Sequence, residues 1–246
     1  MTGNGLRATG AKKPKMKYLL ITGASAGIGL STAKLFLDSN YKVINLSRRP
    51  CPDERVIHFR ADLTTPEFYS LIKPEIEKHL SKAEEIVLVH NAAKLTNDGV
   101  RTTESDALRE ILEINVIAPN TLNLSILPFM KPGSSIIYLG STLSEKAVPN
   151  SFSYVTSKHA VIGMMRATCQ DLVSSDVHTA CICPGFTDTE MLREHVPAEF
   201  MAQIKNMSSF GRLVKPDEIA NAIFWSSQNP VINGSIIHAN LGQIES

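Results

Sequence analysis

Short apolar segments alternate with amphipathic helical segments along most of this chain, and this alternation restricts the fold more than any other feature of the sequence. The segments that we interpret as strands are rich in valine, isoleucine and leucine, and they occupy residues 17–22, 41–47, 56–60, 84–92, 135–140, 177–183 and 235–239. Regular alternation of strands and helices with short links is typical of a parallel sheet whose two faces are both covered by helices. We therefore predict an α/β fold, a doubly wound parallel sheet of about seven strands.

The intervals between these strands show helical periodicity. The expected helices occupy residues 28–37, a region from 65 onward, 104–129, 153–173 and 216–227. Thr65 is expected to cap the second helix, with Pro66 at its first position, and Pro74 is expected to kink or divide it. The third region is expected to be disturbed near Pro119, whereas residues 186–210 have only weak, interrupted periodicity.

Length and composition favour one globular domain. The 246 residues are 43% hydrophobic and 20% charged, which is enough apolar material for a sizeable core. The chain has no internal repeat and no low-complexity linker, so we predict a single domain over residues 17–246. No apolar run reaches the ~18 residues of a membrane span, so we expect no association with a membrane.

The first residues of the chain differ from the rest in charge. Residues 1–17 contain lysine and arginine but no acid, so the remainder carries a net negative charge, which argues against a nucleic-acid-binding surface. Residues 1–16 lack the apolar stretch of a secretory signal, and we expect a flexible basic arm or a remnant of a cloning vector, with a short transit peptide as the alternative. The cysteines have no metal-ligand spacing and nothing requires an oxidising compartment, so we expect no metal site and a cytoplasmic location.

The first strand runs directly into a glycine-rich turn, T-G-A-S-A-G-I-G at residues 22–29, and then into a helix. Glycines in such a turn let the backbone approach a diphosphate, and the helix N-terminus supplies free N–H groups and a partial positive charge. We therefore expect this turn to bind the diphosphate of a dinucleotide. The spacing G-x-x-x-G-x-G differs from the usual G-x-G-x-x-G, and a tight glycine-rich loop without a ligand is the alternative.

Tyr154 and Lys158 stand four residues apart in a helical segment, so their side chains share one face with Cβ atoms about 5–6 Å apart. A cation beside a phenol favours the phenolate, and such a tyrosine can exchange a proton with a carbonyl or alcohol oxygen. Ser141 follows the fifth strand and can donate a second hydrogen bond to the same oxygen. Alone the Tyr/Lys pair is weak evidence, because such pairs are common on exposed helices.

Four motifs, taken in this order, resemble the short-chain dehydrogenase/reductase family: the turn at 22–29, N-A-A at 91–93, S…Y-x-x-x-K at 141–158 and P-G at 184–185. The resemblance extends over nearly the whole chain, and the ordered combination is far more specific than any single motif. It implies a Rossmann-like domain that binds a nicotinamide dinucleotide. It also implies a small-molecule carbonyl or alcohol substrate and assembly as a homodimer or homotetramer.

The resemblance assigns roles to individual residues. Tyr154 is implied as the general acid in carbonyl reduction, Lys158 as its cationic neighbour, Ser141 as a hydrogen-bond donor to the substrate oxygen, and Asn115 as the holder of a water beside the lysine. For Asn115 the alternative is a polar core residue that bends its helix. The residues implied to bind the cofactor are Gly23, Ser25, Gly27, Ile28, Gly29, Ser47, Arg48, Asp62, Leu63, Asn91, Ala92, Ala93, Tyr154, Lys158, Pro184, Gly185, Thr187 and Thr189. Residues 186–210 are implied to form a lid over the substrate, with a plain amphipathic surface helix as the alternative.

The end of the second strand bears on the choice between NAD and NADP. An acid there would bind the ribose hydroxyls, whereas this chain has Ser47 and Arg48, a hydroxyl and a planar cation suited to a 2′-phosphate. We therefore expect NADP(H) rather than NAD(H), although Ala26 stands where NADP enzymes of the family often have a basic residue. Ala93 replaces the family's usual glycine, and Asn240-Leu241-Gly242 replaces the usual D-G-G.

Together these features predict an NADPH-dependent oxidoreductase that reduces a ketone or aldehyde, with Tyr154 as proton donor. An NAD-dependent alcohol dehydrogenase is one alternative. A dinucleotide-sensing protein of the same fold without turnover is the other, although such a protein need not keep Ser141, Asn115 and the Tyr/Lys pair together.

Overall fold

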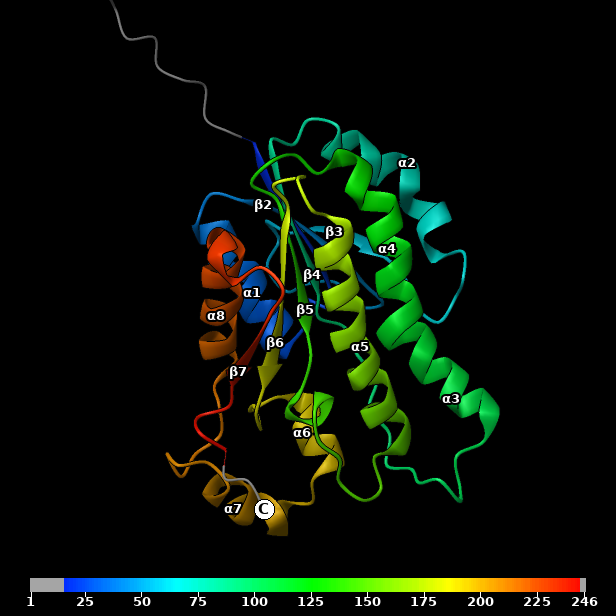
Figure 1. The fold of residues 1–246 in the computed structure, drawn as a ribbon, viewed down its shortest axis with the longest axis vertical. Helices are drawn as coiled ribbons and strands as arrows, with labels where there is room; N and C mark the ends of the chain where they lie inside the picture. The colour runs from blue at the N-terminus through cyan, green and yellow to red at the C-terminus, as the bar shows by residue number, and fades with distance from the viewer. Residues whose placement is uncertain (1–15, 244–246) are drawn as a thin grey trace, which may run out of the picture.

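The computed structural model describes residues 16–243 and shows a seven-stranded sheet with helices on both faces (Figure 1). The strands are β1 (Lys17–Thr22), β2 (Lys42–Ser47), β3 (Ile57–Arg60), β4 (Glu85–His90), β5 (Ser135–Leu139), β6 (His178–Pro184) and β7 (Ser235–Ala239). The α-helices are α1 (Gly27–Asp38), α2 (Phe68–Leu80), α3 (Ser105–Leu112), α4 (Ala118–Ile126), α5 (Phe152–Asp171), α6 (Glu190–His195), α7 (Met201–Asn206) and α8 (Pro216–Gln228). All neighbouring strands are parallel, in the order β3-β2-β1-β4-β5-β6-β7, so the predicted doubly wound fold is confirmed.

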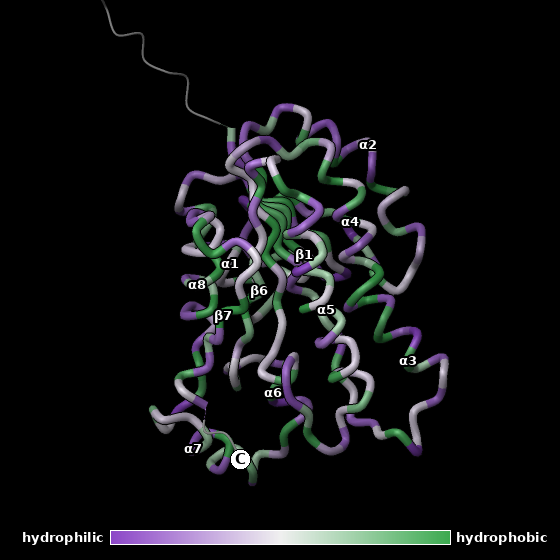
Figure 2. The backbone as a smooth tube through the Cα atoms, viewed as in Figure 1, coloured by the Kyte–Doolittle hydropathy of each residue, from purple (hydrophilic) through white to green (hydrophobic). Residues whose placement is uncertain are grey.

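Each strand contributes to two cores, because successive side chains of a strand point to opposite faces of the sheet. Leu20 lies in the core beneath α2, α4 and α5, whereas Leu19 and Ile21 lie in the core beneath α1 and α8. All three side chains are fully buried. Figure 2 shows the same arrangement as a band of hydrophobic residues along the central strands.

The parallel direction of the strands gathers their carboxyl ends at one edge of the sheet. β1 lies between β2 and β4, so the chain order reverses at β1 and β4. In open α/β sheets such a reversal forms the crevice where ligands bind. In Figure 1 this edge faces α6 and α7, and the glycine-rich turn, N-A-A, Ser141 and P-G all follow strands that end there.

Three local expectations need correction or refinement. α2 begins at Phe68, not beside Thr65, because Pro66 lies within a preceding turn. The same helix continues through Pro74 without a break. The disturbance expected near Pro119 is present as a π-helical segment, Glu113–Ile117, which joins α3 to α4, and Pro119 is the second residue of α4.

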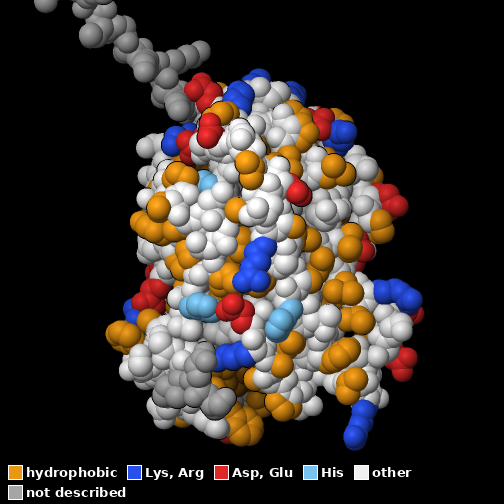
Figure 3. Space-filling view, viewed as in Figure 1, with side chains coloured by type: hydrophobic (Ala, Val, Ile, Leu, Met, Phe, Trp, Pro, Cys, Tyr) orange, Lys and Arg blue, Asp and Glu red, His pale blue; other side chains and the backbone are white. Residues whose placement is uncertain are grey.

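Three further observations concern the surface, the helices and the N-terminal residues. Basic and acidic side chains are interspersed on the face shown in Figure 3, without a continuous basic stripe. In the described part of the chain, no helix combines the length and apolar character needed to cross a bilayer. The basic arm expected at residues 1–16 lies, apart from Met16, outside the described residues.

Candidate active site

The β1–α1 turn has the close packing that requires glycine. Gly27 adopts a φ of +53°, in the left-handed region that favours glycine. A Cβ on Gly29 would overlap the carbonyl oxygen of Gly23 and lie 2.6 Å from Nδ2 of Asn91. Ala26, the N-cap of α1, makes no side-chain capping bond, and the first turn contains no acid. An anion could therefore approach the backbone closely at the start of α1, where no carboxylate would repel it.

Asn91 fastens this turn to the end of β4. Its Nδ2 donates to the carbonyl oxygens of Thr22 and Gly23 at 2.9 and 3.0 Å. The hydroxyl of Thr22 accepts in return from the main-chain N–H groups of Asn91 and Ala92 at 3.1 and 3.0 Å. The structure thus brings Asn91 and Ala92 of the predicted N-A-A motif directly against the predicted turn, and Ala93 is the next residue of the motif.

A groove of about 340 Å³ opens beside the turn. Its lining residues are Ser25, Ala26, Gly27, Leu30, Ser31, Asp188, Thr189, Glu190, Arg193 and Pro216. A Cβ on Gly27 would lie 3.1 Å from Cγ2 of Thr189, so the predicted turn and the predicted Thr189 face each other across a narrow passage. The space beside Gly27 would be filled by any larger side chain, and it lies at a helix start without a capping side chain. Such a space fits the diphosphate of a dinucleotide.

The end of β2 is followed by two arginines, and the hydroxyl of its last residue, Ser47, is already hydrogen-bonded within the protein. Ser47 is buried, and its Oγ accepts from Nδ2 of Asn45 at 2.9 Å and donates to the carbonyl oxygen of Arg49 at 2.5 Å. Arg49 forms an ion pair with Glu190 at 3.1 Å. Arg48 is exposed and, within residues 16–243, its guanidinium makes no hydrogen bond or ion pair.

Asp62 and Leu63 follow β3 beside this strand end. The main-chain N–H and hydroxyl of Thr64 hold the pKa of Asp62 below its usual value, with smaller contributions from Arg48 and Arg60. Leu63 is buried in the core beneath α2. Both residues therefore lie at the end of the crevice where the adenosine of a dinucleotide is expected, although only Asp62 is exposed.

Tyr154 and Lys158 lie on α5 against the end of β5, and Ser141 is the second residue after that strand. Lys158 is buried, its Nζ donates to the carbonyl oxygen of Leu139 at 2.7 Å, and it lies 5.5 Å from the ring centroid of Tyr154. The hydroxyl of Tyr154 makes no hydrogen bond to another described residue, yet its oxygen is not sealed in the interior. Oγ of Ser141 accepts from the N–H of Leu143 at 3.1 Å, which leaves its hydroxyl hydrogen free to donate.

The buried ammonium of Lys158 has unused hydrogen-bonding capacity. An ammonium offers three donors, and a single protein acceptor is found for it within the described residues. Burying a cation with unpaired donors is costly, so polar groups from a bound molecule or from water are expected at the remaining positions. The ribose hydroxyls of a nicotinamide dinucleotide are acceptors of the right kind.

Asn115 is buried in the π-helical segment. Its Oδ1 accepts from the main-chain N–H of Lys94 at 2.8 Å, and its Nδ2 donates to the carbonyl oxygen of Lys94 at 3.0 Å and to Oγ of Ser157 at 2.9 Å. The side chain therefore joins the loop after β4 to α5 next to Lys158. Both hydrogens of its Nδ2 are used and its Oδ1 accepts one hydrogen bond, so the side chain has no donor left for the water expected beside Lys158.

The segment after β6 contains the remaining predicted residues. Gly185 follows Pro184 at the crevice, and a Cβ there would lie 2.9 Å from Cα of Asn240, so the unusual Asn240 packs against the P-G motif. Oγ1 of Thr187 donates to the carbonyl oxygen of Gly185 at 2.9 Å. Thr189 caps α6 by accepting from the N–H of Leu192 at 3.3 Å.

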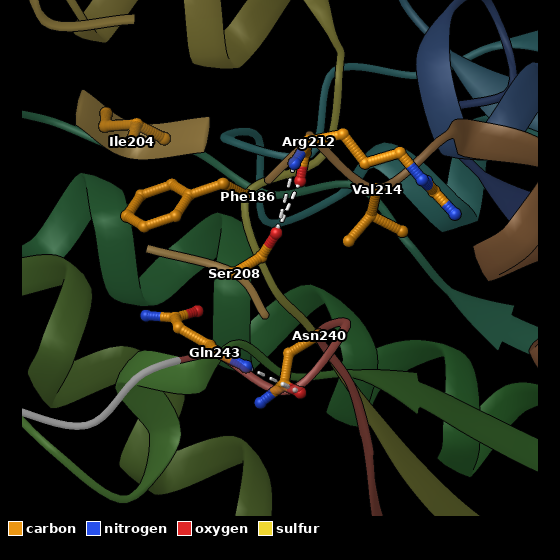
Figure 4. A pocket seen from close by; sticks show the side chains of 7 residues that line it. All are labelled: Phe186, Ile204, Ser208, Arg212, Val214, Asn240 and Gln243. Atoms are coloured by element: carbon orange, nitrogen blue, oxygen red, sulfur yellow. Dashed lines mark hydrogen bonds between the residues drawn. The ribbon is translucent and has the colours of Figure 1, made fainter. Parts of the chain in front are cut away.

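Residues 186–210 form short helices without a buried residue in α6 or α7. Nε2 of His195 lies 2.9 Å from the carbonyl oxygen of Leu95, which ties α6 to the loop after β4. Beside this segment lies a small cavity of about 10 Å³, shown in Figure 4 and lined by Phe186, Ile204, Ser208, Arg212, Val214, Asn240 and Gln243. Its volume suits at most about one water molecule, so it is not a substrate pocket.

Four residues with a place at this site were absent from the expectations: Asp98, Arg49, Glu190 and His195. The bonds of Asp98 and His195 connect residues far apart in sequence, so no local pattern reveals them. The second arginine of the Arg-Arg pair was visible in the sequence, but its partner on α6 was not. Among the described residues no group of histidine, cysteine and acidic side chains is arranged to hold a metal ion.

Comparisons with known proteins match these features over almost the entire chain. A family model described as enoyl-(acyl carrier protein) reductase matches residues 23–243. Protein FixR of Bradyrhizobium diazoefficiens is 31% identical over 92% of this chain and 86% of its own length. The 3-oxoacyl-[acyl-carrier-protein] reductase FabG of Thermotoga maritima is 27% identical over 93% of this chain and 98% of its own length.

The fold has close counterparts among solved structures. A short chain dehydrogenase family protein from Francisella tularensis superposes with a TM-score of 0.84 at 26% identity, covering 92% of this chain and 98% of that one. The aldohexose dehydrogenase of Thermoplasma acidophilum also gives a TM-score of 0.84, at 25% identity over 93% of this chain.

Proposed function

The chain belongs to the short-chain dehydrogenase/reductase family, an oxidoreductase family that uses nicotinamide dinucleotides, and we propose that it is an NADPH-dependent enzyme that reduces a ketone or an aldehyde to an alcohol. The observation that carries the proposal is the buried Lys158 ammonium, 5.5 Å from the ring of a tyrosine whose hydroxyl has no protein partner among the described residues. Buried donors are normally satisfied, so the remaining donors of Lys158 are expected to face a molecule bound in the crevice or ordered water.

Each of the four residues has a separate task in this reaction. The cofactor, when bound, supplies the hydride. Tyr154 gives its phenolic proton to the carbonyl oxygen as that oxygen gains negative charge. Ser141 donates a hydrogen bond to the same oxygen, and Lys158 stabilises the phenolate that remains.

Asn115 acts on this group through the backbone. Its amide holds Lys94 on one side and Ser157, the neighbour of Lys158, on the other. We assign it the role of fixing the main chain beside the lysine, where a water molecule would return the proton to Tyr154.

The proposal of NADP(H) rests on Arg48. Within the described part of the chain its guanidinium is free, whereas Arg49 is already paired with Glu190. A planar guanidinium binds a phosphate through two parallel hydrogen bonds, which suits the 2′-phosphate. Ser47 contributes less than its position indicates, because its hydroxyl donates inside the protein.

The substrate, the oligomeric state and the location of the protein are proposed only in general terms. The relative from Thermotoga maritima is named as a reductase of 3-oxoacyl-[acyl-carrier-protein]. For this chain we propose only a small-molecule carbonyl substrate, a homodimer or homotetramer, and a cytoplasmic location.

The direct test is the initial rate of NADPH and NADH oxidation against one panel of carbonyl compounds. The panel contains α-diketones, quinones, aromatic aldehydes, steroid ketones and 3-oxoacyl thioesters, and binding of both cofactors is measured alongside by fluorescence. Turnover with NADPH supports the reductase. Faster turnover with NADH, or alcohol oxidation with NAD alone, would replace it with the dehydrogenase alternative, and binding without any turnover would favour a sensing role.

The cofactor preference has a sharper test in two neighbouring variants. Arg48→Ala is expected to weaken NADPH binding by about tenfold to a hundredfold, the loss of one or two charge-assisted hydrogen bonds, and to leave NADH binding nearly unchanged. Arg49→Ala is the matched control, since that guanidinium is committed to Glu190, and its effect on NADPH should be several-fold smaller. Equal weakening of both cofactors by Arg48→Ala contradicts the phosphate assignment.

A further inference from the structure

The helix that carries Tyr154 begins without a cap of its own. α5 starts at Phe152, so Tyr154 lies in its first turn. The first N–H groups of an α-helix have no partner within the helix and need another acceptor. Ser151, the N-cap residue, makes no side-chain capping bond.

Asp98 supplies these acceptors from a loop 55 residues away in sequence. Its carbonyl oxygen accepts from the N–H of Phe152 at 3.2 Å, and its Oδ1 accepts from the N–H of Ser153 at 3.0 Å. The hydroxyl of Ser153 donates to the other carboxylate oxygen. The N–H of Asp98 donates in turn to the carbonyl oxygen of Asn150 at 3.1 Å. The first two free donors of α5 are therefore both taken by one residue outside the helix, immediately before Tyr154.

The carboxylate itself is held in place. Oγ1 of Thr96 donates to Oδ2 of Asp98 at 3.2 Å. Partial burial works to raise the pKa of Asp98, but the hydrogen bonds from Ser153, Thr96 and Thr103 outweigh it and leave the pKa below its usual value. The group is thus an ionised acceptor at neutral pH, and a negative charge at a helix N-terminus is also favourable for the helix dipole.

The same loop contacts the other parts of the site. Lys94 is bonded through its main chain to Asn115, and the carbonyl oxygen of Leu95 faces His195 of α6. Residues 94–98 therefore contact the π-helical segment, the lid and the start of α5 within one short stretch. Displacement of this stretch from α5 would change how Tyr154 stands relative to Ser141.

We propose that Asp98 is a positioning residue for the reaction, which fixes the first turn of α5 and with it the hydroxyl of Tyr154 over the substrate oxygen. This inference rests on the proposed function, because it takes Tyr154 as the proton donor. It predicts an effect on the chemical step rather than on binding, since Asp98 contacts neither the cofactor groove nor the lid. A misplacement of about 1 Å at a reacting group can lower a rate by about a hundredfold.

The test compares three variants in NADPH oxidation with the best carbonyl substrate of the panel. Asp98→Ala is expected to lower kcat by about tenfold to a hundredfold, with substrate KM and NADPH affinity within about twofold of the wild type. Asp98→Asn keeps an oxygen for the N–H of Ser153, so it should recover kcat to within about threefold. Asp106→Ala is the matched control, because that carboxylate lies in the first turn of α3, is highly exposed and pairs with Arg109.

The outcomes separate the inference from the function that it rests on. A kcat unchanged in Asp98→Ala, with only a lower melting temperature, makes Asp98 a simple helix cap and overturns the inference alone. An Asp98→Asn variant as slow as Asp98→Ala overturns it too, because geometry would then not be what matters. Should Asp98→Ala fail to fold, Asp98→Glu keeps the charge but moves the carboxylate by one methylene, and a kcat equal to that of the wild type then overturns the inference. A wild-type chain that turns over nothing in the panel overturns the proposed function first.

Discussion

The two sides of the candidate active site are held in place by different kinds of contact. On the side of β5 and α5, the polar bonds are made by buried groups: Lys158 to Leu139, and Asn115 to Lys94 and Ser157. We call this the catalytic wall, and it comprises β5, the segment Glu113–Ile117, α5 and the loop 94–98. On the opposite side, α6 and α7 contain no buried residue, and ion pairs such as Arg193–Asp188 and Arg49–Glu190 are largely exposed.

This difference predicts a division of labour. Buried hydrogen bonds fix orientation, because an unpaired group in the interior costs about 1–3 kcal/mol. Exposed ion pairs contribute at most about 1 kcal/mol and are screened by salt, so we expect the segment that they hold to open and close more easily than the catalytic wall. We therefore expect changes in the catalytic wall to lower kcat and changes in the lid, residues 186–210, to alter KM or cofactor release.

Apart from loss of the Tyr154 hydroxyl itself, the largest effect is expected from Asn115→Ala in the catalytic wall. The change leaves the N–H and carbonyl of Lys94 without partners, which should destabilise the fold by about 2–4 kcal/mol and lower kcat by about a hundredfold. Urea unfolding and steady-state kinetics measure the two losses. Asn120→Ala is the matched control, an exposed asparagine on α4 that should change neither. A normal kcat in Asn115→Ala would remove the distinction between the two sides.

The second effect concerns pH and the end of β4, where the catalytic wall meets the core. Burial lowers the pKa of His90 to about 4, although the hydrogen bond with Asn123 works against it. Between pH 6.5 and 4 the unfolded chain therefore binds more protons at this residue than the folded chain. His90 therefore makes its full contribution to the free energy of unfolding above pH 6.5. That contribution should fall by about 3 kcal/mol as the pH drops to 4.

Unfolding of the wild type and of His90→Gln at several pH values isolates that contribution. The variant keeps a donor for Asn123 but does not titrate, so the difference in unfolding free energy between the two proteins should change with pH in this window and be constant above it. A difference that is the same at pH 4 and pH 7 would show that His90 is not held neutral.

The smallest effect is expected in the lid. His195→Ala removes the contact with the carbonyl oxygen of Leu95, worth about 0.5–1.5 kcal/mol, so substrate KM should rise by up to about tenfold while kcat stays within twofold. His159→Ala is a close control, because His159 and His195 make the same contact to the carbonyl four residues earlier, at 2.9 and 2.8 Å, but His159 lies on the exposed side of α5. A fall in kcat without a change in KM would contradict this prediction and would show that His195 acts as the residues of the catalytic wall do.

The sequence was most informative where chemistry and local geometry coincide. The glycine-rich turn follows a strand and begins a helix, and Tyr154 and Lys158 share one face of a regular helix, so their placement follows from nearest neighbours along the chain. The parallel sheet likewise follows from the alternation of segments. These parts of the fold agree with expectation because tertiary packing reinforces the local preference.

The sequence was least informative where a bond joins distant segments. Asp98 is an unremarkable loop residue until the fold brings it to the start of α5, and Ser47 resembles a phosphate ligand until its hydroxyl is found bonded to Arg49. Thr65 and Pro66 have the pattern of a helix start, yet the helix begins at Phe68 because the preceding residues form a turn after β3. Sequence motifs and local propensities do not predict these contacts, because the contacts join residues that only the folded chain brings together.

One measurement tests the central claim most directly: turnover and NADPH affinity of Tyr154→Phe, determined side by side. The variant keeps the ring next to Lys158 and loses only the proton donor, so cofactor affinity should stay within about twofold while kcat falls by about a hundredfold to ten-thousandfold. Retained turnover would contradict the assignment of Tyr154 as the acid and, with it, the division between a catalytic wall and a lid.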